Sequence, residues 1–109
     1  MNTLEAKKYI YALNDLKNEQ EKLNCKRYEY QRIERKLIQA KKSVKFGQRI
    51  WWHNLELREN IDFCELLKRN EYIYNEFKND FKRISNSLKI QKSIVNDRQR
   101  VVSFYHNKD

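Results

Sequence analysis

The chain has 109 residues, with one glycine and no proline, and carries a formal net charge of +9 at pH 7. Glycine and proline are the specialists of tight turns, so their scarcity argues against a β-sheet protein. The mean hydropathy is −1.06, and no apolar run approaches the roughly 20 residues needed to cross a bilayer. Aromatic residues, at 13%, are too frequent for a disordered chain. We therefore expect an all-α protein without a membrane span.

The start of the chain and its cysteines indicate where it folds. The sequence Met1–Glu5 has no basic start followed by an apolar stretch, so we expect no cleaved signal peptide. Two cysteines, Cys25 and Cys64, are too few for a disulfide framework or a cysteine metal site. The cytoplasm is the expected compartment.

The first predicted helix spans residues 3–45. Its apolar residues recur every seven positions, as Tyr9, Leu16, Leu23, Tyr30, Leu37 and Val44. If these are core a positions, the d positions are Ala12, Glu19, Lys26, Ile33 and Ala40. A repeat this long predicts a helix, whereas the polar d residues argue against a regular coiled coil.

The chain is expected to reverse within residues 46–60. Gly47 is the one residue that ends a helix at low cost in a left-handed conformation, and Asn54 and Asn60 are suited to cap the next helix. The adjacent Trp51 and Trp52 have two interpretations. They form a plug that caps the hairpin, or a docking tip with one ring turned outward.

The second predicted helix spans residues 56–105. Its a positions are Leu67, Tyr74, Phe81, Leu88, Val95 and Val102, and its d positions are Phe63, Asn70, Phe77, Ile84, Gln91, Arg98 and Tyr105. A third apolar row lies beside them, made of Leu66, Ile73, Ile94 and Val101. The prediction is one domain over residues 1–109, a long antiparallel helical hairpin resembling a coiled coil.

The charge distribution favours the same pairing. Residues 21–53 hold ten basic and three acidic side chains, net +7, and residues 54–80 hold four basic and seven acidic, net −3. Antiparallel folding sets these two segments side by side. On a hairpin that turns near residue 51, Cys25 lies opposite residues near 77, too far from Cys64 for a disulfide.

The sequence contains few of the residues and motifs that catalytic sites require. His53 and His106 are the only histidines, and no glycine-rich phosphate loop occurs. We therefore expect no catalytic, cofactor or metal site, and a protein that is not an enzyme.

The basic balance, with a pI near 9.6, is compatible with nucleic-acid binding. The densest basic cluster consists of Arg32, Arg35, Lys36, Lys41, Lys42, Lys45 and Arg49. These residues recur at every angle around the helix, and no helix-turn-helix or zinc signature accompanies them. Nucleic acid is therefore a less favoured partner than protein.

The apolar surface of the second helix points to a protein partner. Its three adjacent apolar rows are wider than one neighbouring helix can cover, so part of the surface should remain exposed to solvent. The candidate partner-binding residues are Trp51, Trp52, Phe77, Phe81, Ile73, Leu88, Ile94 and Val101. A homodimer forming a four-helix bundle and an assembly with another helical protein both remain open.

In organisation the chain resembles the small helical accessory proteins encoded beside LXG toxins, which belong to the WXG-like superfamily of type VII secretion in Gram-positive bacteria. The features that carry the resemblance are a short helical hairpin, an aromatic reversal and a terminal Y-x-x-x-D pattern at Tyr105 and Asp109. The W-x-G motif is absent, because Gly47 precedes Trp51 and Trp52.

The resemblance implies an adaptor or chaperone-like protein that binds the helical N-terminal domain of an LXG effector, a second accessory protein, or both. It also implies that Tyr105 and Asp109 act as an export signal for a signal-peptide-independent route. On this interpretation the polar d residues Glu19, Lys26, Gln91 and Arg98 fix the register against the partner helix. Two alternatives are a phage- or plasmid-type regulator that binds a host protein or nucleic acid, and a self-assembling structural coiled coil.

Overall fold

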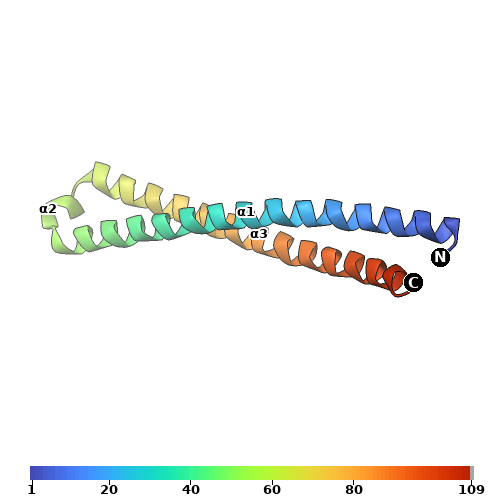
Figure 1. Cartoon of the computed structure of the whole chain (residues 1–109). Helices are drawn as coiled ribbons and strands as arrows, with labels where there is room; N and C mark the ends of the chain where they lie inside the picture. Colours follow the sequence, from blue (N-terminus) through green and yellow to red (C-terminus); the bar gives the residue numbers. More distant parts are fainter. Residues whose placement is uncertain (109) are drawn as a thin grey trace. The chain divides into compact units, whose positions relative to one another are not determined.

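The computed structural model describes residues 1–108 and forms three α-helices in that range (Figure 1). They are α1 (Thr3–His53), α2 (Leu55–Arg58) and α3 (Ile61–His106). No strand occurs among the described residues. The all-α class predicted from composition and heptad spacing is confirmed.

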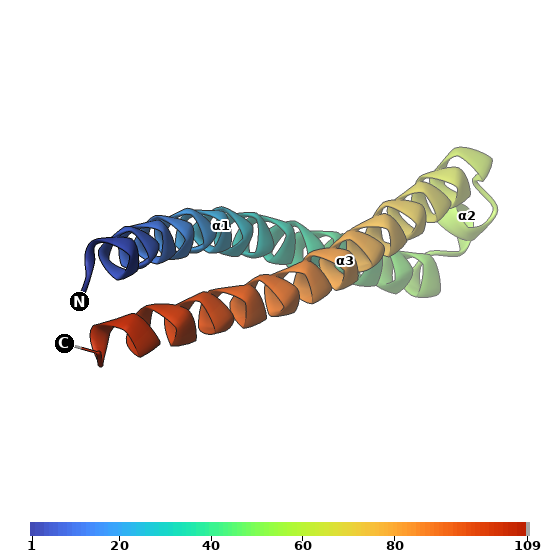
Figure 2. The ribbon, with the colours of Figure 1, turned by 90° about the vertical axis from the view of Figure 1, so that its right-hand side faces the viewer.

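Contacts divide the chain into two compact units, and each unit pairs one segment of α1 with one segment of α3. Unit 1 comprises residues 1–29 and 84–109, and unit 2 comprises residues 30–83. The boundary falls inside both long helices, which continue through it without a break (Figures 1 and 2).

Both units contain an antiparallel helix pair. In unit 1, Tyr9 contacts Tyr105 and Glu19 contacts Gln91, so residue numbers fall along α3 as they rise along α1. Unit 2 shows the same order, because Tyr30 contacts Phe81 whereas Gly47 lies against Leu67. The predicted antiparallel pairing of the two heptad segments is confirmed within each unit.

The heptad rows supply the buried surface of both units. The buried apolar side chains are Ala12, Leu16, Leu23, Ile33, Ala40, Ile84, Leu88 and Val102, and all of them occupy predicted a or d positions. Of all the predicted a and d residues, Arg98 alone is exposed. Burial at seven-residue spacing is the expected result when two helices pack along one shared stripe.

The first helix is longer than the sequence predicted, and the expected role of Gly47 is wrong. The helix α1 continues to His53, so Gly47 lies within it, buried and without a positive φ angle. A side chain at this position would collide with the Cδ2 methyl of Leu67 on α3. Gly47 therefore lets two helices approach closely and does not end a helix.

The reversal lies inside the predicted range, and its two capping residues are as expected. The side-chain oxygen of Asn54 accepts a hydrogen bond from the Leu57 amide at 3.2 Å, at the start of α2. The side-chain oxygen of Asn60 accepts one from the Phe63 amide at 2.9 Å, just before α3 begins at Ile61. The second long helix thus begins five residues later than residue 56, because α2 occupies part of the predicted range.

This extension of α1 also corrects the expected register. A turn near residue 51 would place residues near 77 opposite Cys25, yet its neighbour Lys26 bonds to Gln91 in unit 1. The later reversal moves the pairing along α3 by several helical turns.

Gly47 gives a first testable prediction. Replacement by alanine removes the helix penalty of glycine, about 1 kcal/mol, but displaces the flexible end of Leu67. We expect these effects to offset each other, so the free energy of unfolding of the G47A variant should lie within about 1 kcal/mol of the parent value. The larger G47I side chain should destabilise the fold by about 2–3 kcal/mol through overpacking. Urea unfolding followed by circular dichroism measures both, and equal stability of G47I and the parent would contradict the close approach.

Candidate protein-binding surfaces

The third apolar row of α3 is exposed in both units. Leu66 and Ile73 in unit 2 have 48% and 40% of their surface exposed, and Val101 in unit 1 has 43%. Ile94, in the same row, is half-buried. One neighbouring helix covers the a and d rows but does not reach the third. The predicted uncovered apolar stripe is therefore present, and we call these four residues the α3 apolar row.

In unit 2 a groove of about 340 Å³ runs beside the α3 apolar row. Its lining residues come from both helices and are Lys36, Gln39, Ala40, Ser43, Asn70, Ile73 and Phe77. Ala40, Ile73 and Phe77 form its apolar part, and polar side chains surround them. An apolar centre with a polar rim is the usual composition of a protein interface.

In unit 1 a second groove, of about 250 Å³, lies beside Val101. It is lined by Lys8, Tyr11, Ala12, Asp15, Arg98, Val101 and Tyr105. Tyr105 also packs edge-on against Tyr9, with ring centroids 6.4 Å apart. The tyrosine expected to serve in export thus takes part in the packing of unit 1, and Asp109 lies outside the described residues.

The structure separates the remaining candidate residues into core and surface. Leu88 is 9% exposed and belongs to the core of unit 1, so its assignment to a partner surface is wrong. Phe77 is half-buried at the unit 2 groove. Phe81 is half-buried against Tyr30, with ring centroids 5.0 Å apart. Neither phenylalanine is fully covered, although Phe77 and Phe81 occupy the predicted d and a rows.

The two tryptophans form one assembly with Arg58. The Arg58 guanidinium donates from Nε to the Trp51 carbonyl at 2.7 Å and from Nη2 to the Trp52 carbonyl. It also lies over both indole rings, 5.0 Å and 5.4 Å from their centroids. These carbonyls belong to the last turn of α1, where such groups have no partner within the helix. Arg58 therefore caps α1 by hydrogen bonds, by cation–π contacts and by its charge at the negative end of the helix dipole.

The structure distinguishes the two interpretations of the tryptophan pair that the sequence left open. Trp51 is half-buried and fits the predicted plug, whereas Trp52 is 66% exposed. Arg58 was missed as a functional residue, although a basic residue shortly after a helix end is a known capping signal.

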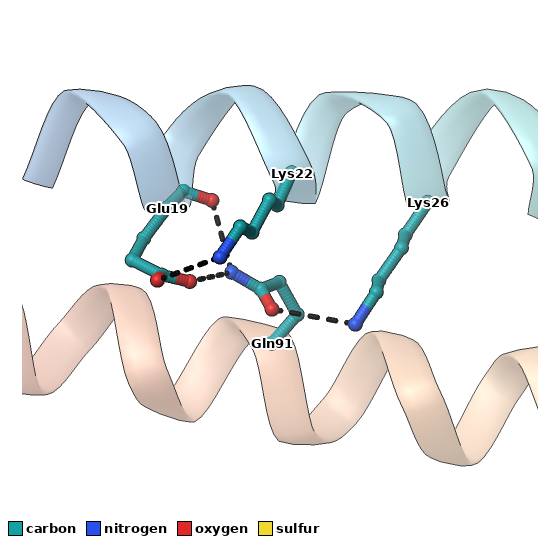
Figure 3. A network of polar contacts seen from close by, with 4 residues as sticks. All are labelled: Glu19, Lys22, Lys26 and Gln91. Carbon is teal, nitrogen blue, oxygen red and sulfur yellow. Dashed lines mark hydrogen bonds and ion pairs between the residues drawn. The ribbon is translucent and has the colours of Figure 1, made fainter. Parts of the chain in front are cut away.

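A polar layer crosses the apolar packing of unit 1 (Figure 3). Gln91 is 2% exposed, and its amide donates to the Glu19 carbonyl at 3.0 Å and to the Glu19 carboxylate at 2.6 Å. Lys26 donates to the Gln91 side-chain oxygen at 3.3 Å, and Lys22 pairs with the Glu19 carboxylate at 3.3 Å. Three of the four polar d residues therefore satisfy one another across the helix pair. These three residues fix the register of α1 against α3, which corrects the expectation that they fix it against an outside partner.

The layer shifts the titration of Glu19. Donation by the Gln91 amide lowers the pKa of this carboxyl below its ordinary value of 4.5, and the nearby Lys22 acts in the same direction. Partial desolvation acts in the opposite direction. The net effect favours the charged form of Glu19 in the folded chain.

A pH-dependent contribution to stability follows. A carboxyl with a lowered folded pKa stabilises the fold above its unfolded pKa, and this contribution disappears as the pH falls through the folded value. We expect the thermal midpoint to fall as the pH is lowered below the ordinary carboxyl pKa of 4.5, and the E19Q variant to show a shallower fall. Thermal unfolding by circular dichroism across this range is the measurement. Parallel profiles for E19Q and the parent would exclude the carboxylate as a source of the slope.

Ion pairs within the described residues stay inside single helices. The three that occur there, including Lys22 with Glu19, each join residues three positions apart. The opposite charges of residues 21–53 and 54–80 therefore form no direct ion pair in residues 1–108.

Other site chemistry is sparse over the described chain. Cys25 is exposed and Cys64 half-buried, and both are free thiols. Residues 1–108 contain no group of three histidine, cysteine, aspartate or glutamate side chains placed to hold a metal ion. No helix in the same range combines the length and apolarity that membrane crossing requires.

Comparisons with protein families, with curated proteins and with solved structures found no match to this chain.

Proposed function

We propose that this chain is a protein-binding adaptor that packs its helices against the helical N-terminal domain of an LXG-type effector of type VII secretion. The observation that carries the proposal is the α3 apolar row, which stays exposed in unit 2 at Leu66 and Ile73 and in unit 1 at Val101. Exposed apolar stripes bordered by polar residues mark surfaces that bind other proteins.

The spacing of the row favours a helix as the bound element. Leu66 and Ile73 are seven residues apart, as are Ile94 and Val101, a rise of about 10.5 Å along the helix. A partner helix with apolar residues every seven positions presents its side chains at the same interval. Each groove beside the row offers room for such side chains at its apolar lining residues.

The choice of an LXG effector rests on the sequence organisation. Two heptad helices flank an aromatic reversal, and a Y-x-x-x-D pattern occurs at Tyr105 and Asp109, as in the accessory proteins that it resembles. A neighbouring gene for a long LXG-type helical protein would identify the natural partner.

Binding to that effector domain tests the proposal. The chain and the effector N-terminal domain are co-expressed, purified and titrated by calorimetry. We expect a stable complex, weakened at least about tenfold in the double variant I73D/V101D, because a buried unpaired carboxylate opposes apolar packing. The matched control is Y72D, since Tyr72 precedes Ile73, is 66% exposed and lies off the α3 apolar row. Failure to form a complex, or equal loss with Y72D, would overturn the proposal.

Self-assembly is a second candidate, favoured by the same exposed row. Two copies can cover each other's rows in a four-helix bundle. Sedimentation equilibrium distinguishes the two functions, because self-assembly predicts a stable oligomer that I73D/V101D dissociates, whereas the adaptor predicts a monomer.

A further inference from the structure

One stretch of α1 in unit 2 concentrates positive charge. Residues 35–53 contain no aspartate or glutamate, and their six basic residues are Arg35, Lys36, Lys41, Lys42, Lys45 and Arg49. All six are exposed. None takes part in the ion pairs found among residues 1–108. The adjacent segment of α3 therefore leaves this charge without direct compensation.

Part of this charge lies on one face of α1 together with exposed apolar side chains. Arg35, Lys42 and Arg49 are seven residues apart and so share a face of the helix. Ile38 and Phe46 lie four residues before and after Lys42, next to it on the same face, and are 47% and 62% exposed. We call these five residues the basic–apolar face. The wider cluster surrounds the helix as the sequence indicated, but this part of it is ordered into one surface.

The mixture of groups on this face favours protein over nucleic acid. Phosphate contacts require cations and hydrogen-bond donors, and they gain nothing from an exposed isoleucine between two arginines. An amphipathic helix can bury Ile38 and Phe46 while its carboxylates pair with Arg35, Lys42 and Arg49. Charge complementarity together with the two apolar side chains therefore favours an acidic amphipathic helix here.

We infer that the basic–apolar face of α1 binds an acidic amphipathic helix, which places apolar side chains on Ile38 and Phe46 and carboxylates beside Arg35, Lys42 and Arg49. This inference rests on the proposed function and adds the charge of the partner and a second surface that receives it. The site lies wholly within residues 35–49 of unit 2.

Two designed helical peptides test the inference on the full chain. They share one apolar stripe, and their flanking positions are all glutamate in one and all lysine in the other. Single-stranded oligo(dT) and a DNA duplex of about 20 base pairs serve as further probes. Fluorescence anisotropy gives each affinity at low and high salt. We expect the glutamate peptide to bind at least about tenfold more tightly than the lysine peptide, and salt to reduce this difference.

Variants locate the binding site. R35E/K42E/R49E should weaken the glutamate peptide at least about tenfold, and F46S should weaken it with no change in chain charge. The matched control K7E/K17E/R27E changes the net charge equally at three exposed residues of unit 1. Circular dichroism verifies that each variant remains helical.

The outcomes separate this inference from the proposed function. Equal affinity for both peptides would overturn the acidic preference, yet retained binding to the effector domain would leave the adaptor function standing. Tighter binding to oligo(dT) or duplex DNA than to the glutamate peptide would overturn the inference in favour of nucleic acid. Equal weakening of peptide binding by the control triple variant would overturn the assignment of binding to this face. A homodimer that R35E/K42E/R49E dissociates would show instead that a second copy of the chain occupies the face.

Discussion

Replacing Gln91 by alanine should destabilise the chain by about 2–3 kcal/mol, a large loss for a protein of this size. Gln91 is the most buried polar residue of the described chain, and its amide donates hydrogen bonds to both the backbone carbonyl and the carboxylate of Glu19. The Q91A change removes these bonds and the acceptor for Lys26, and it leaves a cavity between α1 and α3. Urea unfolding followed by circular dichroism gives the free-energy difference.

The matched control for Q91A is Q20A. Gln20 follows Glu19 on α1 but is exposed, so its replacement should change stability by less than about 0.5 kcal/mol. Similar effects of the two changes would mean that the polar layer contributes nothing beyond ordinary surface residues. The Q91L variant adds a test of pairing specificity. Leucine fills the space but leaves Glu19 and Lys26 without their partner, and we expect self-association to increase.

Replacing Arg58 by alanine should destabilise the chain by about 2 kcal/mol and release both indole rings. Arg58 closes the end of α1 through the carbonyls of Trp51 and Trp52, and its guanidinium lies over both rings. The chain has two tryptophans, so its tryptophan fluorescence reports on this assembly alone. We expect a red-shifted emission maximum and a lower unfolding midpoint for R58A.

Lysine and a distant arginine serve as comparisons for R58A. The R58K variant keeps the charge at the helix end but loses the planar donor pair, so it should recover less than half of the lost stability. The R69A variant removes an exposed arginine that makes no contact of this kind, and it should match the parent. Unchanged tryptophan emission in R58A would contradict the capping role.

The sequence was sufficient to predict which faces of the helices pack. Residues seven apart lie on one face whatever helix stands opposite, so the row from Tyr9 to Val44 could be assigned to the core without a partner. The same reasoning identified the α3 apolar row, because a third row of apolar residues cannot reach a single neighbour. Both conclusions depend on helix geometry alone.

The end of α1 could not be predicted because Gly47 has two physical uses. The absence of a side chain permits a left-handed cap, and it equally permits close contact with another helix. The structure uses the second, against Leu67. Sequence spacing does not distinguish the two, since the contact involves a residue twenty positions away.

The polar layer was misassigned for a related reason. The heptad spacing places the polar residues Glu19, Lys26 and Gln91 in core positions, where they were expected to contact a partner helix. Which residue lies opposite Glu19 depends on where the chain reverses, and α1 ends eight residues beyond the predicted residue 45. With the reversal at Asn54–Asn60, Gln91 reaches Glu19 and the three residues satisfy one another. An error of two helical turns in the end of α1 thus changed the interpretation of a distant site.

Hydroxyl-radical footprinting of the chain, alone and with the effector N-terminal domain, tests whether the α3 apolar row is the binding surface. We expect Leu66, Ile73 and Val101 to be labelled in the free chain and protected in the complex. Leu23, which is buried, should stay unlabelled throughout, and Tyr72, which is exposed and lies off the α3 apolar row, should stay labelled. A complex in which Leu66, Ile73 and Val101 remain fully labelled would contradict the claim that the α3 apolar row is the binding surface.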